Sequence, residues 1–96
     1  MEDSLETKFQ SLVAEWKGDT RYEPSLVQMI LHPAYQQIVG LGPKVLPLLF
    51  RELQDDPDHW FWALQAITGE DVGRRATTVG DATERWLKWG RKHGYL

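Results

Sequence analysis

Prolines and glycines divide this chain into short apolar segments, and that division is the strongest constraint on its fold. Within the segments, hydrophobic residues recur three or four positions apart, which is the period of an amphipathic helix. His32-Pro33 separates two segments, because a residue that precedes proline disfavours helical backbone. No segment shows the alternation of a strand. The sequence therefore predicts an all-α fold, a compact bundle of five to six short helices.

The predicted helix boundaries follow from residues that favour helix ends. Asp3 and Glu6 have the spacing of a capping box, and Gly18 is expected to end the first helix, about 5–17. Further helices are expected near 26–31, 33–40, 43–53, 57–68 and 81–94, with three N-caps at Ser25, Asp56 and Asp81. The segment between Gly69 and Gly80 is expected to be a long loop and a candidate contact region.

Composition limits the class of protein. With 96 residues, 42% of them hydrophobic, and five tryptophans, the chain is expected to form one domain, residues 1–96, with its own core. It has no cysteine, so neither disulfides nor thiolate metal sites can hold the fold. The N-terminus lacks the pattern of a signal peptide, and no apolar run is long enough to span a bilayer. We therefore expect a cytoplasmic protein that makes no membrane contact.

The charge is distributed unevenly along the chain. Residues 1–72 hold twelve acidic and five basic side chains, a net −7, and residues 73–96 hold two acidic and six basic ones, a net +4. Such asymmetry can steer a partner or be an accident of a small chain. The basic residues of the C-terminal third could contact nucleic-acid phosphates: Arg74, Arg75, Arg85, Lys88, Arg91 and Lys92. They could equally form a solvated face with helical ion pairs, Asp81 with Arg85 and Glu84 with Lys88.

One part of the chain resembles a known type of helical hairpin. Leu41-Gly42-Pro43-Lys44-Val45-Leu46-Pro47-Leu48-Leu49, the loop at 55–58, and Ala63-Leu64-Gln65-Ala66-Ile67 resemble a HEAT-type hairpin, over about residues 38–89. The whole chain also resembles a class of short, uncharacterised bacterial helical proteins. HEAT-like proteins mostly bind proteins or nucleic acids on an exposed helical face and share no catalytic residues. The resemblance therefore implies binding and transfers no catalytic residue.

The sequence His59-Trp60-Phe61-Trp62 carries the most specific expectation about a binding surface. Successive helical residues are about 100° apart, so Trp60 and Trp62 should point to nearly opposite sides. We expect Trp60 to face the core together with Ala63, Leu64 and Ile67. Trp62 is then either covered by a neighbouring helix or exposed as an anchor for a partner. The residues predicted to bind a partner are Trp62, His59, Gln65, Arg74 and Arg75.

Motifs for catalysis or for cofactors are absent from the sequence. His32, His59 and His93 do not form a pair at the spacing of a helical metal site, and the acidic residues at 55–58 are better explained as helix-capping groups. Neither a phosphate-binding loop nor a nucleophile with an adjacent base is found. We therefore predict a non-enzymatic protein-interaction module without a cofactor or metal, for example a regulatory or antitoxin-type protein that binds a protein partner or a second copy. Nucleic-acid binding is the alternative prediction.

Overall fold

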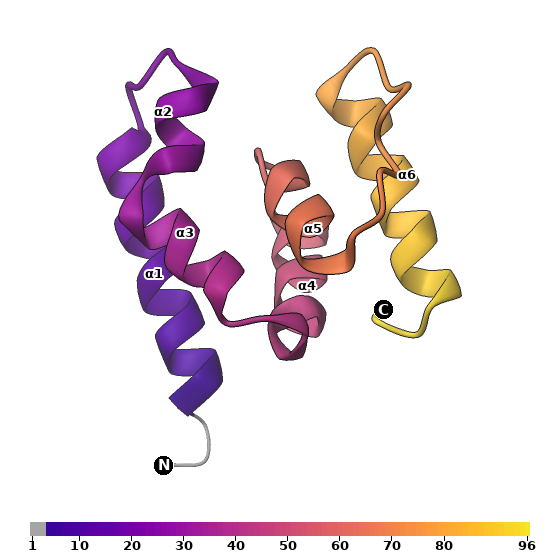
Figure 1. The fold of residues 1–96 in the computed structure, drawn as a ribbon, viewed down its shortest axis with the longest axis horizontal. Helices are drawn as coiled ribbons and strands as arrows, with labels where there is room; N and C mark the ends of the chain where they lie inside the picture. Colours follow the sequence, from indigo (N-terminus) through magenta and orange to yellow (C-terminus); the bar gives the residue numbers. More distant parts are fainter. Residues whose placement is uncertain (1–3) are drawn as a thin grey trace.

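Six α-helices and one short 3-10 helix form residues 4–96, the part of the chain that the computed structural model describes (Figure 1). These residues contain no strand, so the predicted all-α fold is confirmed. The elements in chain order are α1 (Ser4–Thr20), α2 (Leu26–Leu31), α3 (Pro33–Gly40), η1 (Pro43–Val45), α4 (Leu46–Asp55), α5 (Phe61–Thr68) and α6 (Val79–Lys92).

The helices pack in a row that runs from α1 to α6. α1 packs against α3, α3 against α5, and both α4 and α5 against α6, as Figure 1 shows from left to right. The radius of gyration is 12.8 Å, close to the value of about 12.5 Å expected for a compact domain of this length. The prediction of a compact bundle is therefore confirmed. Within residues 4–96, no helix combines the length and the apolar character needed to cross a membrane.

Aromatic side chains fill the core in two groups. Trp16, Tyr35 and Trp60 meet between α1, α3 and the start of α5, with ring centroids 4.5 to 5.5 Å apart. Phe50 and Trp86 lie 6.3 Å apart between α4 and α6. The inward face of η1 and α4 is buried and consists of Val45, Leu46, Leu49, Phe50 and Leu53. Burial of these large apolar side chains is the main force that holds the row of helices together.

Several predicted helix boundaries are confirmed. The Ser25 hydroxyl accepts a hydrogen bond from the Gln28 amide and caps α2. Pro33 opens α3, where its missing N–H costs nothing. Gly69 ends α5 with a φ of 76°, a left-handed conformation that favours glycine. These three boundary residues, Ser25, Pro33 and Gly69, act through local backbone chemistry, which is why the sequence alone predicts them.

The predicted end of the first helix is wrong. α1 continues through Gly18 and ends at Thr20, so Gly18 is a helical residue and does not form a left-handed cap. The Thr20 hydroxyl donates to the Trp16 carbonyl at 2.6 Å and is buried in the last turn. The burial of Trp16 against α3 keeps this turn helical despite the weak propensity of glycine. The predicted capping box at Asp3 lies outside the described residues.

The predicted start of the fifth helix is also wrong, since α5 begins at Phe61 and residues 57–60 form a loop. Asp56 is not its N-cap; it lies at the C-terminal end of α4, where its carboxylate pairs with Lys17. Asp58 does act locally, because its carboxylate accepts the His59 amide at 2.7 Å. The acidic loop therefore shapes the turn and binds α1, and it does not cap α5.

The last helix starts two residues earlier than predicted. Its N-cap is Thr78, whose hydroxyl accepts the Asp81 amide at 3.0 Å, so Asp81 is not the cap but lies in the first turn. The connection between α5 and α6 is correspondingly shorter and spans residues 69–78. This loop folds over Trp86, with Gly73 against the indole edge. Its path forms one wall of the site described next.

Candidate functional site

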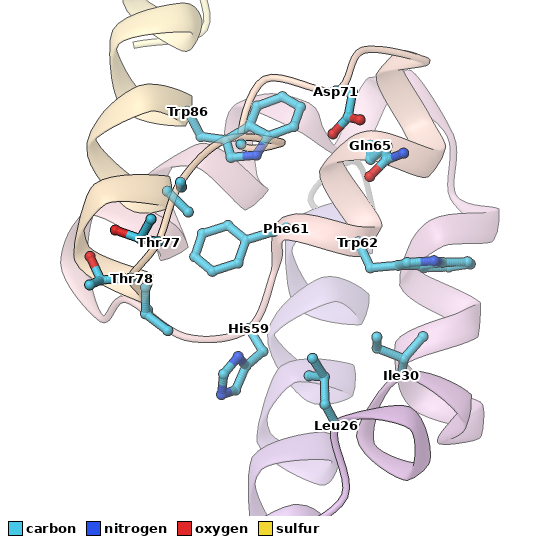
Figure 2. Close-up of a pocket in the computed structure, with 14 residues that line it drawn as sticks. Leu26, Ile30, His59, Phe61, Trp62, Gln65, Asp71, Thr77, Thr78 and Trp86 are labelled. Carbon is cyan, nitrogen blue, oxygen red and sulfur yellow. The ribbon is translucent and has the colours of Figure 1, made fainter.

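An apolar groove of about 420 Å³ lies between α2, α5, the loop at 69–78 and the first turns of α6 (Figure 2). This volume falls in the range of ligand sites, roughly 300–1,000 Å³. The apolar walls come from three helices that are distant in sequence: Leu26 and Ile30 from α2, Phe61 and Trp62 from α5, and Val79, Ala82 and Trp86 from α6. The groove is therefore a product of tertiary packing, with no single motif behind it.

α2 contributes unusually exposed apolar residues to this region. It has only six residues and buries none of them fully. Leu26, Val27 and Leu31 are 47%, 61% and 58% exposed. A helix this short can place one narrow stripe against α3, so the rest of its hydrophobic run must face outward. Leu26, Val27 and Leu31 thus form an apolar edge of α2 beside the groove. Contiguous exposed apolar surface of this kind often marks a site of interaction.

Trp62 stands at the edge of the groove and is 44% exposed, whereas Trp60 is fully buried. The predicted opposition of these two side chains is therefore confirmed. A second hollow of about 250 Å³ is lined by Trp62 as well, together with Gln65, Ala66 and Gly69. Trp62 thus lines both hollows. Of the two readings that the sequence left open, exposure describes Trp62 better than coverage by a neighbouring helix.

Tyr35 of α3 fixes the rotation of α5. Its hydroxyl donates to the His59 carbonyl at 2.9 Å and accepts the Ala63 amide at 3.0 Å. One buried hydroxyl thus provides a hydrogen-bond partner for the His59 carbonyl, just before α5, and for the Ala63 amide in its first turn. The indole N–H of Trp60 is buried without a hydrogen-bond partner within residues 4–96. Because Tyr35 holds this turn, Trp60 points inward and Trp62 points toward the groove.

Polar groups line the groove sparingly. They are His59, Gln65, Asp71, Thr77 and Thr78. Figure 2 shows Asp71 and Trp86 at the end of the groove opposite Leu26, with Phe61 between them. The Asp71 carboxylate lies 3.9 Å from Nε of Arg74, beyond hydrogen-bond distance. Apart from His59, Asp71 is the one ionisable side chain among these lining residues.

The structure brings together three of the five residues predicted to bind a partner. His59, Trp62 and Gln65 all line the groove. Arg74 and Arg75 lie on the adjoining loop with exposed side chains, and neither lines it. Sequence reasoning missed the contributions of α2 and α6 and the role of Asp71. The hydrophobic run at 26–31, too short to be buried on all sides, is the signal that could have indicated α2.

The basic residues of the C-terminal third are all exposed: Arg74, Arg75, Arg85, Lys88, Arg91 and Lys92. The predicted ion pair between Arg85 and Asp81 is confirmed at 3.2 Å. The one predicted between Glu84 and Lys88 is not formed within 4.0 Å among the described side chains. These exposed side chains lie on the loop at 69–78 and on α6, and Asp81 neutralises the charge of Arg85.

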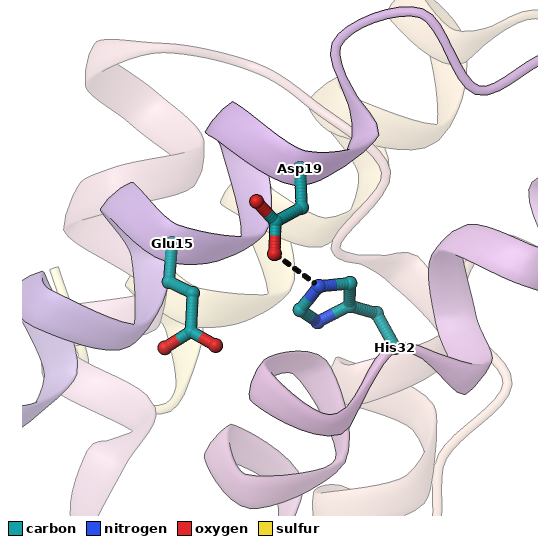
Figure 3. Close-up of side chains that lie close together, drawn as sticks. All are labelled: Glu15, Asp19 and His32. Carbon is teal, nitrogen blue, oxygen red and sulfur yellow. Dashed lines mark hydrogen bonds and ion pairs between the residues drawn. The ribbon is translucent and has the colours of Figure 1, made fainter.

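A second cluster joins Glu15 and Asp19 of α1 with His32, between α2 and α3 (Figure 3). Their potential ligand atoms lie within 4.8 Å of one another, the arrangement of a candidate metal site. The sequence did not predict this cluster, because the histidine is thirteen residues from Asp19. The two carboxylates at a four-residue helical spacing were the available signal.

The hydrogen bonds of His32 oppose metal binding at this cluster. Its Nδ1 accepts the Ala34 amide at 3.0 Å and so caps α3, which places the ring proton on Nε2. Nε2 then donates to the Asp19 carboxylate at 3.0 Å. A metal bound at Nε2 would need the proton on Nδ1, where it would face the Ala34 N–H. We therefore interpret the cluster as a helix cap with a supporting carboxylate.

No family model matches this sequence, and comparison with curated proteins and with solved structures finds no significant match.

Proposed function

We propose that this protein is a non-enzymatic interaction module that binds a protein partner through the groove around Trp62. The observation that carries the proposal is the half-exposed Trp62, which lines two hollows and lies beside the apolar edge of α2. Tryptophan is enriched at the energetic centres of protein interfaces, because one rigid side chain contributes a large apolar area. A regulatory or antitoxin-type protein is an example of this class.

The proposal also includes the HEAT-like interpretation of residues 38–89. In that interpretation α4 and α5 form the hairpin, and α5 presents an exposed helical face to the partner. The contact between α4 and α5, joined by a short loop at 56–60, supports it. The exposed face of α5 then contains Trp62 and Gln65, which line both hollows.

The test begins with Trp62→Ala. A partner is captured from the source organism, identified by mass spectrometry and then purified, and its affinity is measured with both proteins pure. We expect the substitution to weaken binding about thirtyfold, as at a hot-spot tryptophan worth about 2 kcal/mol. The expected loss of stability is small, because the indole is half-exposed.

Leu96→Ala is the matched control, since Leu96 has a similar exposure of 41% and does not line the groove. Unchanged affinity in this control and a strong loss in Trp62→Ala support the proposal. Sedimentation of the protein alone over a range of concentrations determines whether the partner is a second copy. Equal affinity of wild type and Trp62→Ala would overturn the proposal.

Nucleic-acid binding remains the alternative, and the structure adds no further feature in its favour. The groove contains neither lysine nor arginine among its lining residues. A mobility shift at low salt, lost when Arg75 and Lys88 are changed to glutamate, would support the alternative. We expect no such shift.

A further inference from the structure

The charge of the groove indicates the chemistry of its partner, and this inference rests on the proposed function above. Asp71 brings a carboxylate to the end of the groove, and no lining residue is a lysine or arginine. A carboxylate at the edge of an apolar groove attracts a cation, with the modest strength of a charge that is 47% exposed. The groove is therefore matched to positive charge.

The Asp71 carboxylate is available for a partner. Its ion pair with Arg74 is long, 3.9 Å, and both side chains are exposed, at 47% for Asp71 and 79% for Arg74. Such a pair contributes little free energy and rearranges readily. Within residues 4–96 the carboxylate accepts no hydrogen bond, and this long ion pair is its one charged contact. A cation that enters the groove would therefore compete with Arg74 alone.

The aromatic residues of the groove favour the same charge. Phe61, Trp62 and Trp86 line it together. The faces of aromatic rings attract cations, tryptophan most strongly, and arginine is the usual partner. An arginine side chain also carries an apolar stem, which suits a groove whose walls are mostly hydrophobic. Leu26 and Val79 then offer apolar contacts to the residues beside it.

We propose that the groove binds a basic side chain of a partner protein, arginine or lysine, flanked by apolar residues. The charged group lies at Asp71, its stem lies along Phe61 and Trp62, and the apolar neighbours pack against α2 and the first turn of α6. Arg74 is then a competitor for Asp71 and not a contact residue for the partner.

Three capped pentapeptides test this proposal directly. Each has leucine on both sides of a central residue, which is arginine, glutamine or glutamate. Binding is measured by titration calorimetry and by the shift of the Trp62 indole N–H resonance in NMR spectra. We expect the arginine peptide to bind at least about tenfold more tightly than the glutamate peptide, with the glutamine peptide between them.

Two substitutions at the charged end have opposite expected effects. Asp71→Asn should weaken binding of the arginine peptide about threefold and leave the glutamine peptide unchanged, as for a partly exposed charge pair. Arg74→Ala should tighten binding of the arginine peptide, because it removes the competing cation. Glu70→Gln is the control, since this neighbouring carboxylate does not line the groove.

Three outcomes would overturn the inference and leave the proposed function to its own test. One is equal binding of the arginine and glutamate peptides at Trp62, which would show a groove without charge preference. Another is the absence of any Trp62 shift with all three peptides. The third is weaker binding of the arginine peptide after Arg74→Ala, since Arg74 would then be a contact. None of these results depends on the capture experiment with Trp62→Ala.

Discussion

Tyr35 is the single residue on which the geometry of the groove most depends. Its hydroxyl serves as donor to His59 and acceptor from Ala63, across 24 and 28 residues of sequence. Both backbone groups lie at the first turn of α5, where helix geometry leaves amides without internal partners. The orientation of Trp60 and Trp62 is therefore set by a side chain from another helix.

Tyr35→Phe should lower the free energy of unfolding by about 1–3 kcal/mol, because two buried backbone groups lose their partner. Urea denaturation measures this loss, and amide exchange should show the largest loss of protection at Ala63. Tyr22→Phe is the control, since Tyr22 is 88% exposed and should change stability by less than about 0.5 kcal/mol. Equal stability of the Tyr35→Phe protein and the wild type would contradict this role.

For single residues, the sequence predicts which side of a helix a side chain faces better than it predicts where the helix begins. The rotation of about 100° per residue correctly separates Trp60 from Trp62. The start of α5 was predicted at Pro57 from the local capping pattern, and it lies at Phe61 because Tyr35 organises the turn. A hydrogen bond between residues so distant in sequence leaves no local pattern to detect.

At the scale of elements, the contact between α4 and α6 depends on a residue without a side chain. Gly90 is buried in α6 against the ring of Phe50 in α4. A Cβ at this position would lie 2.8 Å from two carbons of that ring, well inside van der Waals contact. Close packing of protein interiors leaves the ring little room to move.

Gly90→Ala should therefore destabilise the protein by about 1–3 kcal/mol through overpacking, despite the better helix propensity of alanine. The matched control is Gly80→Ala in the same helix, where the nearest atom would be the Thr78 hydroxyl oxygen at 3.9 Å. We expect this control to be neutral or more stable by up to about 1 kcal/mol. Chemical denaturation of both variants measures the difference, and a stabilising Gly90→Ala would refute the packing account.

The helices themselves could be predicted from the sequence, but the groove could not. Apolar periodicity and helix-ending residues such as Ser25, Pro33 and Gly69 are local signals, and those elements are confirmed. The groove combines α2, α5 and α6, whose relative placement depends on packing across the whole chain. Trp62 was identified because its position on the helix faces away from the core. Asp71 has no comparable signal in the sequence.

At the scale of the whole molecule, two groups make stability sensitive to alkaline pH. Burial raises the pKa of Tyr35 well above its ordinary value of 10.0. The hydrogen bond from the Ala63 amide opposes this shift, and the charge of Asp58, a smaller effect, adds to it. For Lys17, burial alone would lower the pKa, but hydrogen bonds and charges from Asp56 and Glu52 outweigh it and raise the pKa above 10.5. Both groups hold their protons more tightly in the folded chain.

The stability that Tyr35 and Lys17 contribute should therefore be fully present below about pH 10 and decrease above it. Above this pH the unfolded chain releases protons that the folded chain retains. The urea midpoint, measured between about pH 8 and about pH 11, should fall with rising pH. In Tyr35→Phe the decrease should be shallower, since one of the two groups is absent. A midpoint that stays constant through this range would exclude both contributions.

The placement of Trp60 and Trp62 on opposite sides of α5 has a consequence for how this protein can change over evolutionary time. Selection for folding acts on Trp60, which the core encloses, while the indole two positions later lies at the surface. A mutation at codon 62 alters the shape of the groove and leaves the enclosed residues in place. A substitution at position 62 can therefore change this part of the surface while Trp60 and the core around it stay the same.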